Sequence, residues 1–354
     1  MQIFKKPTKT SENVRVLFVI KERKVYGTKT KCYGLFNSCE FVSRKLNEIG
    51  VCSKTIQVID NNCIDRHVSE YKPTHCFIEA LWVVPEKFKV LSKLHPKVKW
   101  IIRLHSMVPF LSSEGMAFEW IEEYLKLRSS GINISISCNN DDLYEDLNSL
   151  YKGGISYSPN IYYPDPSING NENINIDKSE NDIHIGCFGA LRVLKNHTQQ
   201  ALWAIEFANK NNKYLKLHIN VSEHEQKEAG VVLRNLRAIF ADTPHSLVEH
   251  PWYSHEDFLN LVKRMDIGMQ ISFTETFNIV SADFVACGIP IAVSEEITFI
   301  NPLCKGKATE KQSVMDALWW CSKGKKIGLT KWNKCLLQLH NNRATEAWLD
   351  LLKY

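Results

Sequence analysis

The sequence lacks a run of apolar residues long enough to cross a membrane. A membrane-spanning helix needs about 20 consecutive apolar residues, and no segment of the 354 residues approaches that length. The first residues, MQIFKKPTKTSENVRV, have no apolar stretch behind their lysines, so they do not show the pattern of a secretory signal. We therefore predict a protein without an integral membrane segment, located in the cytoplasm (the host cytoplasm if the chain is viral).

The 11 cysteines lack the paired spacing of a metal site. Neither a CxxC nor a CxxH pair occurs, and metal ligands must be close enough to reach one ion from a turn or a helix. An Asp-x-Asp pair at a predicted strand end is missing as well. The odd number of cysteines in a chain without a signal argues against a disulfide framework. We predict that the protein has no metal site and requires no cofactor.

Length and charge set broad limits. A single hydrophobic core stops growing before 354 residues, which favours two domains. The fractions of hydrophobic (44%) and charged (23%) residues are ordinary for a globular protein. The net charge of +5 suits an anionic substrate but identifies no class of partner.

Apolar runs and helical patterns alternate along the chain in two blocks. Residues 14–20 (VRVLFVI) are almost continuously apolar, as expected of a buried parallel strand. Strand-like runs alternate with helical patterns after it, which indicates βαβ units. In the first block we predict strands at 53–59, 74–81, 99–105 and 133–138, and helices at 37–50, 86–94 and 117–127.

The pattern stops at residues 161–182 and then restarts. This stretch is rich in proline, asparagine and acidic residues, a composition that predicts a linker. We predict two Rossmann-like, doubly wound α/β domains facing each other across a cleft, with ligands at the carboxyl ends of the strands. The predicted parts are an acceptor-side domain at 1–160, a donor domain at 183–330, and a helix at 331–354 that crosses back towards the first domain.

The first informative motif is IGCFGALRVLKNHTQQALWAIEFA, residues 185–208. A predicted strand ends at Gly189, a loop carries Arg192 and Lys195, and a helix begins near Asn196 or Thr198. The N–H groups and dipole of a helix N-terminus attract phosphate, and an arginine with a lysine could clamp a diphosphate. The alternative is a solvated basic turn.

The second motif is SFTETFNIVSADFVACGIPIAVSEE, residues 272–296. Glu275 precedes a predicted helix at 279–287 and Asp283 lies about one turn inside it, so two carboxylates could accept hydrogen bonds from sugar hydroxyls. Asn278 near the helix start leaves backbone donors for phosphate. The alternative is an amphipathic helix with a solvated Asp283.

Together, FGALRVLK and ETFNIVSADFVACGIPIAVS resemble the C-terminal domain of GT-B fold glycosyltransferases, especially the retaining family 4. That family has a glycine loop with an Arg…Lys pair, followed by Glu-x7-Glu and an Ala-x-Gly-x-Pro run. The resemblance covers residues 183–296, and the N-terminal half shows only a general likeness. Two departures are Asp283 in place of glutamate and Asn278 in place of glycine.

The resemblance implies a role for each matching residue. Gly189 belongs to the glycine loop, Arg192 and Lys195 would hold the donor diphosphate, and Glu275 would contact the donor sugar in catalysis. Asp283 would bind the ribose hydroxyls. The residues that would line the sugar and phosphate pocket are Thr276, Phe277 and Asn278.

Two positions in the first half match the family loosely. His105 ends a predicted strand where the family often has a histidine facing the cleft, which makes it the second catalytic candidate. A histidine hydrogen-bonded beneath the loop is the alternative. The loop with Gly34 resembles the family's glycine loop, with a plain βα turn as the alternative.

The implied function is metal-independent, retaining transfer of a sugar from a UDP- or GDP-sugar to an acceptor hydroxyl. The acceptor is not specified by the sequence. The basic C-terminal region and a general similarity to phage glycosyltransferases make a modified base of phage DNA one candidate, so nucleic acid is a possible partner. Polysaccharide, lipid and protein are the other candidate acceptors. A nucleotide-sugar epimerase and a catalytically silent nucleotide-sugar binder are the alternatives.

The most basic part of the chain is residues 304–334, in which Trp319, Trp320 and Trp332 lie among lysines. Such stretches occur on surfaces that contact nucleic acids or membranes. We predict instead a solvated face over a buried tryptophan pair.

Overall fold

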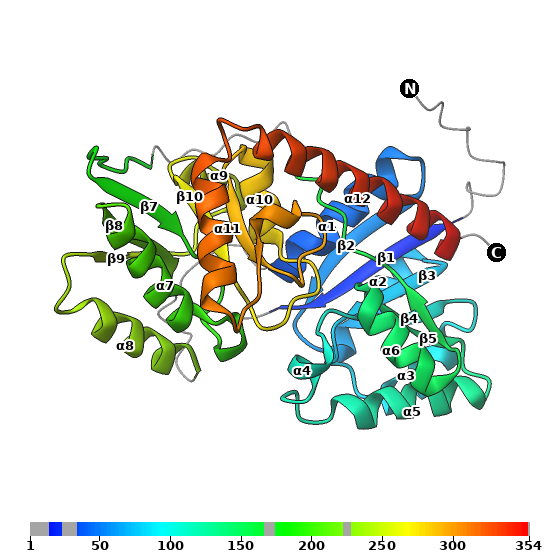
Figure 1. Ribbon diagram of the computed structural model, residues 1–354. Coiled ribbons are helices and arrows are strands. Elements are labelled where there is room, and N and C mark those ends of the chain that lie inside the picture. Colours follow the sequence, from blue (N-terminus) through cyan, green and yellow to red (C-terminus); the bar gives the residue numbers. More distant parts are fainter. Residues whose placement is uncertain (1–13, 23–33, 166–173, 222–227, 353–354) are drawn as a thin grey trace. The chain divides into compact units, whose positions relative to one another are not determined.

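The computed structural model of the chain describes residues 14–22, 34–165, 174–221 and 228–352 (Figure 1). The chain divides into two compact units. Described residues of the first unit are 14–22, 34–164 and 341–352, and those of the second are 165, 174–221 and 228–340. Among the described helices, none combines the length and hydropathy required of a membrane-spanning segment.

The first unit is built on a six-stranded sheet in the order β2-β1-β3-β4-β5-β6, in which all neighbouring strands are parallel. The strands are β1 (Arg15–Lys21), β2 (Cys52–Val58), β3 (His75–Glu79), β4 (Lys99–Leu104), β5 (Ile134–Cys138) and β6 (Ile155–Tyr157). The helices are α1 (Gly34–Glu48), α2 (Ile64–Tyr71), α3 (Glu86–Leu94), α4 (Val108–Leu111), α5 (Ala117–Ser129) and α6 (Asp141–Tyr151).

Strand β1 shows why its sequence is continuously apolar. Leu17 and Val19 point into a core formed with α2, α3, α5 and α6, whereas Val16, Phe18 and Ile20 point into a second core formed with α1 and the end of α12 (Leu329–Leu352). Helices therefore cover both faces of the sheet, as in doubly wound folds, and both sets of alternate side chains are buried.

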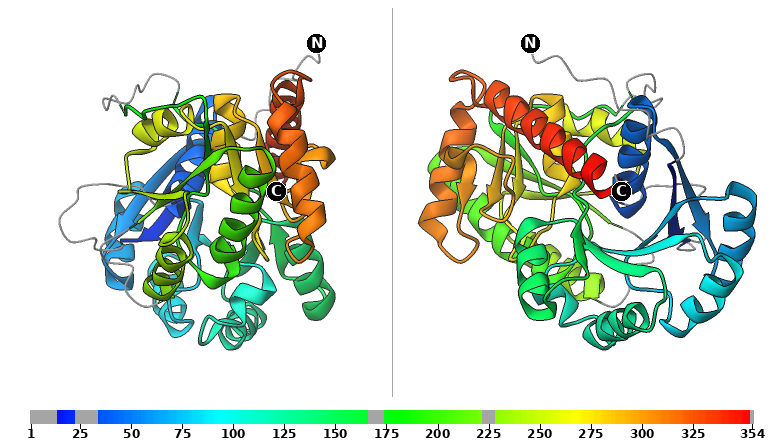
Figure 2. Two further views of the ribbon diagram at one scale, coloured as in Figure 1. Left: turned by 60° about the vertical axis from the view of Figure 1, so that its left-hand side comes forward. Right: turned by 90° about the vertical axis from the view of Figure 1, so that its right-hand side faces the viewer.

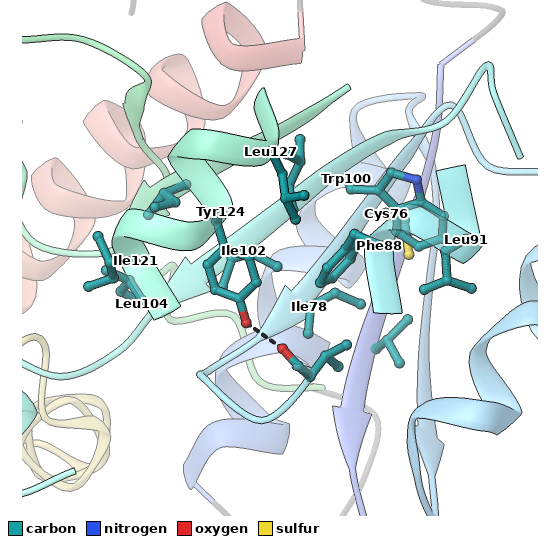
Figure 3. Packing of buried hydrophobic residues seen from close by; sticks show 14 of the residues in the cluster. Cys76, Ile78, Phe88, Leu91, Trp100, Ile102, Leu104, Ile121, Tyr124 and Leu127 are labelled. Atoms are coloured by element: carbon teal, nitrogen blue, oxygen red, sulfur yellow. Dashed lines mark hydrogen bonds between the residues drawn. The ribbon is translucent and has the colours of Figure 1, made fainter. Parts of the chain in front are cut away.

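Aromatic side chains fill the first of these cores (Figure 3). The ring of Phe88 meets Trp100 and Tyr124 edge to face, with both ring-centre distances 5.7 Å. The Tyr124 hydroxyl donates to the carbonyl of Val83, so this buried polar group is satisfied. This packing fixes α3 and α5 on the sheet.

The second unit repeats the plan with the order β12-β11-β10-β7-β8-β9, again with parallel neighbours. The strands are β7 (Asp182–Gly186), β8 (Tyr214–Asn220), β9 (Ser246–His250), β10 (Ile267–Gln270), β11 (Ile291–Ser294) and β12 (Lys305–Gly306). The helices are α7 (His197–Lys210), α8 (Glu228–Phe240), α9 (His255–Val262), α10 (Ile279–Cys287), α11 (Lys311–Lys323) and the first part of α12.

Two glycines let α10 pack closely on the middle of the second sheet. Gly186 of β7 and Gly268 of β10 are partners in register, and the ring of Phe284 covers both. A Cβ on Gly268 would lie 2.6 Å from that ring, and a Cβ on Gly186 would lie 2.8 Å from it and 2.5 Å from the ring of Phe188. Only glycine fits at both positions without moving a buried ring.

The predicted fold class, two doubly wound α/β units, is confirmed. The predicted helices 86–94 and 279–287 coincide with α3 and α10. The first unit extends to residue 164, with Ile161 and Tyr162 buried in it, and takes up α12 from Asn341 onward. Gly34 begins α1, and the loop before it lies outside the described residues.

The prediction of a buried tryptophan pair in the basic stretch was wrong. Trp319 and Trp332 are 49% and 55% exposed. The core-facing residues of α11 have smaller side chains, so Trp319 is left on the outer face of this helix. These core-facing residues are Val314, Met315, Ala317, Leu318 and Cys321.

Candidate functional site

The candidate site lies where the strand order of the second sheet reverses. The chain builds outward from β7 to β8 and β9, then returns to β10 on the other side of β7. The loops after β7 and β10 therefore leave adjacent strands at the same edge, the place where open α/β sheets bind ligands. The loop after β7 leads into α7 and the loop after β10 into α10.

Hydrogen bonds tie these two loops together. The backbone N–H of Phe273 donates to the carbonyl of Leu194 at 2.9 Å, and the Asn196 amide donates to the carbonyl of Ile271 at 3.1 Å. Gln200 of α7 accepts from the N–H of Ile271 at 2.8 Å and donates to the carbonyl of Lys195 at 2.7 Å. The two motifs found in the sequence thus form one hydrogen-bonded structure.

Glu275 is the centre of the side-chain contacts. The ammonium group of Lys195 forms an ion pair with its Oε1, and the same oxygen accepts from Ser272 Oγ at 3.0 Å and Asn278 Nδ2 at 2.8 Å. The side chain of Glu275 is 7% exposed and that of Lys195 is 25% exposed. Among the described residues no hydrogen bond reaches Oε2 of Glu275, so this oxygen is the one available to a ligand.

Asn278 explains how α10 starts. Its backbone lies in the left-handed region, with φ 59°, where asparagine and glycine are tolerated best. Its Oδ1 accepts from the N–H of Ser281 at 2.8 Å and caps the helix, while its amide donates to Gln270 at 2.9 Å as well as to Glu275. Asparagine can therefore replace the glycine of the family that the sequence resembles, and its side chain holds Glu275 in place.

The start of α7 carries a buried, neutral histidine. Asn196 also has φ 59° and does not cap the helix with its side chain. The next residue, His197, is 3% exposed, and neither of its ring nitrogens has a hydrogen-bond partner among the described residues. Burial, with a smaller effect of the Lys195 charge, lowers the pKa of His197 to about 3. His197 therefore adds no positive charge to this helix start.

Gly189 and Arg192 lie on the loop between β7 and α7. Gly189 has φ 107°, which other residues rarely adopt, and its N–H donates to Asn220 at 3.1 Å. A Cβ built on Gly189 would be 3.9 Å from Val280, so this loop runs close to the first turn of α10. Arg192 is half-buried and directly precedes the short 3₁₀ helix Val193–Lys195.

Asp283 lies in a different environment from Glu275. It is 1% exposed on α10, and its Oδ1 contacts Nε2 of His255, the first residue of α9, at 2.7 Å. Thr276 is half-buried, whereas Phe277 is 4% exposed and packs against Phe299 in a tilted arrangement, with a ring-centre distance of 4.9 Å. Phe277 thus belongs mainly to the packing around the site.

His105 follows the carboxyl end of β4 in the first unit and joins a buried polar network. Its Nε2 contacts Glu79, and its Nδ1 lies 3.2 Å from the amide of Asn139. Arg103 pairs with Glu79 at 3.2 Å, and both are fully buried. Burial and the Arg103 charge lower the pKa of His105 despite the opposing effect of Glu79. Burial alone would raise the pKa of Glu79, but Arg103 and His105 hold it below its ordinary value.

Sequence reasoning did not find Gln200, Gln270 or Ser272. Gln270 is 4% exposed at the end of an otherwise apolar strand, and its amide donates to the carbonyl of Phe188 at 2.8 Å. A polar residue inside the apolar run MDIGMQISF was the available signal, because a buried amide needs partners.

Comparison with solved structures identifies the fold. No protein-family model matches the chain, and no curated protein matches its sequence. An α,α-trehalose-phosphate synthase (UDP-forming) from Burkholderia vietnamiensis has a TM-score of 0.66 at 11% identity, over 96% of each chain. A trehalose-6-phosphate structure from E. coli bound with UDP-2-fluoro glucose has a TM-score of 0.65 at 10% identity, over 95% of this chain and 98% of that one. A trehalose-6-phosphate synthase studied for glycosyl transfer with retention has a TM-score of 0.57 at 12% identity, over 82% and 77%. With the two doubly wound parallel sheets, this similarity shows that the chain has the GT-B fold.

Proposed function

We propose that the protein is a glycosyltransferase that transfers a sugar from a nucleotide-sugar donor to an acceptor hydroxyl. One observation carries the proposal: a lysine–glutamate pair, Lys195 and Glu275, lies at the strand-order reversal of the second sheet, beside the N-termini of α7 and α10. Positive charge and helix N-termini suit a diphosphate, and a carboxylate oxygen suits a sugar hydroxyl. The GT-B fold and a similar structure bound with UDP-2-fluoro glucose support it.

In this proposal the donor rearranges the ion pair. The diphosphate binds at the start of α7, and the ammonium group of Lys195 turns from Glu275 to a phosphate oxygen. Arg192 provides a second positive charge. Glu275 then accepts a hydrogen bond from the donor sugar. As the bond to the sugar breaks, negative charge grows on the diphosphate, and fixed positive groups stabilise it without a metal.

The remaining parts of the site have supporting roles in this proposal. Gly189 lets the loop approach the phosphates closely, and Asn278 holds Glu275 through its amide. Asp283 binds the ribose, with His255 orienting its carboxylate. Thr276 lies beside Glu275 in the sequence and contacts the sugar, while Phe277 supports that loop.

We propose that transfer retains the anomeric configuration, as in the family 4 enzymes that the sequence resembles. A structural neighbour studied for glycosyl transfer with retention supports this. The leaving phosphate would take the proton of the acceptor on the same face. Both ring nitrogens of His105 contact Glu79 or Asn139, so we assign it a positioning role and expect His105→Ala to slow transfer without abolishing it. Proton NMR of the first product shows the anomer directly, and an inverted product would contradict this assignment.

The proposal has two candidate acceptors. A modified base of phage DNA follows from the sequence resemblance, whereas the trehalose-phosphate neighbours favour a sugar phosphate. Both offer a hydroxyl group. Assaying each acceptor with the same donor distinguishes them.

A panel of UDP- and GDP-sugars tests the function. A donor that binds the folded state raises the melting temperature, and the stabilising donor is then incubated with candidate acceptors. We expect release of nucleoside diphosphate together with a glycosylated acceptor. A rearranged sugar still attached to its nucleotide would identify an epimerase, and stabilisation without turnover on any acceptor would identify a binder.

A further inference from the structure

The turn between α11 and α12 carries large apolar side chains on the surface of the second unit. We call residues 319–339 the basic hairpin; it appears in orange to red in Figure 2. Its exposed apolar residues are Trp319 (49%), Ile327 (51%), Trp332 (55%) and Leu339 (44%). Trp332, Cys335 and Leu339 are exposed at a spacing of three and four residues, so they share one face of α12.

The basic hairpin has no acidic residue of its own to balance its positive charge. The exposed lysines are Lys323, Lys325, Lys326, Lys331 and Lys334. No aspartate or glutamate occurs in residues 317–345. Some exposed lysines elsewhere pair with a carboxylate on their own turn or helix, such as Lys89 with Glu86 and Lys307 with Glu310. The basic hairpin therefore presents a surface that is both apolar and cationic.

We propose that the basic hairpin docks onto a bilayer surface that contains anionic phospholipids. Trp319 and Trp332 would lie at the level of the headgroups, where tryptophan is enriched. Ile327, at the turn between Gly324 and Gly328, would reach the acyl boundary, and the lysines would contact lipid phosphates. Long lysine side chains keep their charge at the surface while their stems cover apolar groups.

The composition of the basic hairpin favours a membrane over a nucleic acid. Nucleic-acid sites use aromatic rings for stacking and arginine for forked phosphate contacts. In this stretch the cations are all lysine, and the exposed apolar set includes the aliphatic Ile327 and Leu339. Aliphatic side chains gain free energy from a lipid boundary, whereas they have no stacking partner on a nucleic acid.

Vesicle flotation tests this inference, which does not rest on the proposed function. We expect the protein to float with phosphatidylcholine vesicles that contain about 30% phosphatidylglycerol and to remain behind with pure phosphatidylcholine. Tryptophan emission should shift to shorter wavelength only with the anionic vesicles. Sodium chloride at about 0.5 M should weaken binding because it screens the lysines. Equal binding to both vesicles, or to neither, would overturn the inference.

Two variants with matched controls locate the contact. Ile327→Ser should weaken binding about tenfold, whereas Leu202→Ser, at a position that is also 51% exposed in the second unit, should not. Reversing charge at Lys325 and Lys326 together should reduce binding at least about tenfold, whereas reversing it at the exposed Lys263 and Arg264 should not. Matching melting temperatures establish that each variant is folded. Equal losses in the test and control variants would contradict the assignment.

Nucleic acid is the competing partner, so the same protein is titrated with single-stranded and duplex oligonucleotides. We expect no quenching of tryptophan emission at a salt concentration where anionic vesicles still bind. Quenching that Trp332→Ala removes, with vesicle binding unaffected by this change, would assign the basic hairpin to nucleic acid and overturn the proposal.

Discussion

At the scale of single residues, the two acidic residues of the site have different surroundings. Glu275 is held at the strand ends by Lys195, Ser272 and Asn278, with Oε2 available. Asp283 is buried one turn inside α10 against His255. We therefore expect substitution of these two residues to affect interactions with different parts of a nucleotide sugar.

Glu275→Gln and Asp283→Asn separate the two roles. Glu275→Gln should reduce turnover about a hundredfold, because a contact to the sugar that strengthens in the transition state is lost. Its affinity for nucleoside diphosphate should stay within a factor of a few. Asp283→Asn should instead weaken the nucleotide about tenfold. Initial rates and calorimetry measure both, and equal losses of nucleotide affinity would contradict the two roles.

His197 makes stability depend on pH. Its folded-state pKa of about 3 lies below the ordinary histidine value of about 6.5. Between these values the unfolded chain binds more protons, so this contribution to stability is complete above pH 6.5 and is lost as the pH falls towards 3. From pH 7 to pH 5 the loss should be about 2 kcal/mol.

Replacing His197 with leucine should remove that dependence. The imidazole has no partner to lose among the described residues, so an apolar side chain of similar size is tolerated. Urea unfolding at pH 7 and pH 5 should show a difference in unfolding free energy that is about 2 kcal/mol smaller in His197→Leu than in the wild type. The same pH dependence in both proteins would show that His197 is not held neutral.

The motifs in the sequence contain candidate-site residues that contact one another in the structure, but not all of the partners that hold them. Lys195, Glu275 and Asn278 lie in motifs whose residue types already suggest phosphate and sugar binding, and the structure brings them together. The bonds by which Gln200 and Gln270 join the two loops form only because β7 and β10 are neighbours. Strand order is a long-range property, and no local pattern encodes it.

At the scale of elements, the packing of α10 on β7 and β10 places the site. Its ends were predictable, because Asn278 starts the helix and Gly288, with φ 71°, ends it. Helices α8 and α11 were not predicted, although both carry apolar residues at helical spacing, such as Val314, Leu318 and Cys321 of α11. Strand β12 consists of two residues, which is too short for any periodicity.

Gly268→Ala tests how closely α10 packs. The new methyl group would lie 2.6 Å from the Phe284 ring and 2.8 Å from Ile291, and overpacking of this kind costs about 1–3 kcal/mol. Gly230 in α8 is the matched control, since a Cβ there meets nothing within 4 Å, and Gly230→Ala should be neutral or stabilise by up to about 1 kcal/mol. Urea unfolding measures both, and equal effects would contradict the packing described.

At the scale of the whole molecule, the two units share one plan, a parallel six-stranded sheet. In both, the sheet order reverses beside the first strand of the unit, β1 or β7. Repeated βαβ patterns made this architecture predictable from sequence. The C-terminal residues were harder to assign to one of the two units from the sequence, because a single helix, α12, contributes to both.

Metal removal tests the proposed chemistry of the whole enzyme. Among the described residues, no group of three or more histidine, cysteine, aspartate or glutamate side chains is arranged to hold a metal ion. We expect sugar transfer to continue at an unchanged rate in EDTA, because in our proposal Lys195 and Arg192 stabilise the leaving diphosphate. Loss of turnover in EDTA that magnesium or manganese restores would show that a metal replaces this role.

The most direct measurement is calorimetric titration of UDP and GDP into the wild type, Arg192→Ala and Lys195→Ala. Lys210→Ala is the control, because Lys210 lies at the other end of α7, paired with Glu206. Our account predicts that one of the two nucleotides binds the wild type and that each site variant weakens it about tenfold or more, since a charge-assisted contact to phosphate is lost. Lys210→Ala should bind as the wild type does. Binding of neither nucleotide, or unchanged affinity in both site variants, would contradict a donor site at the start of α7.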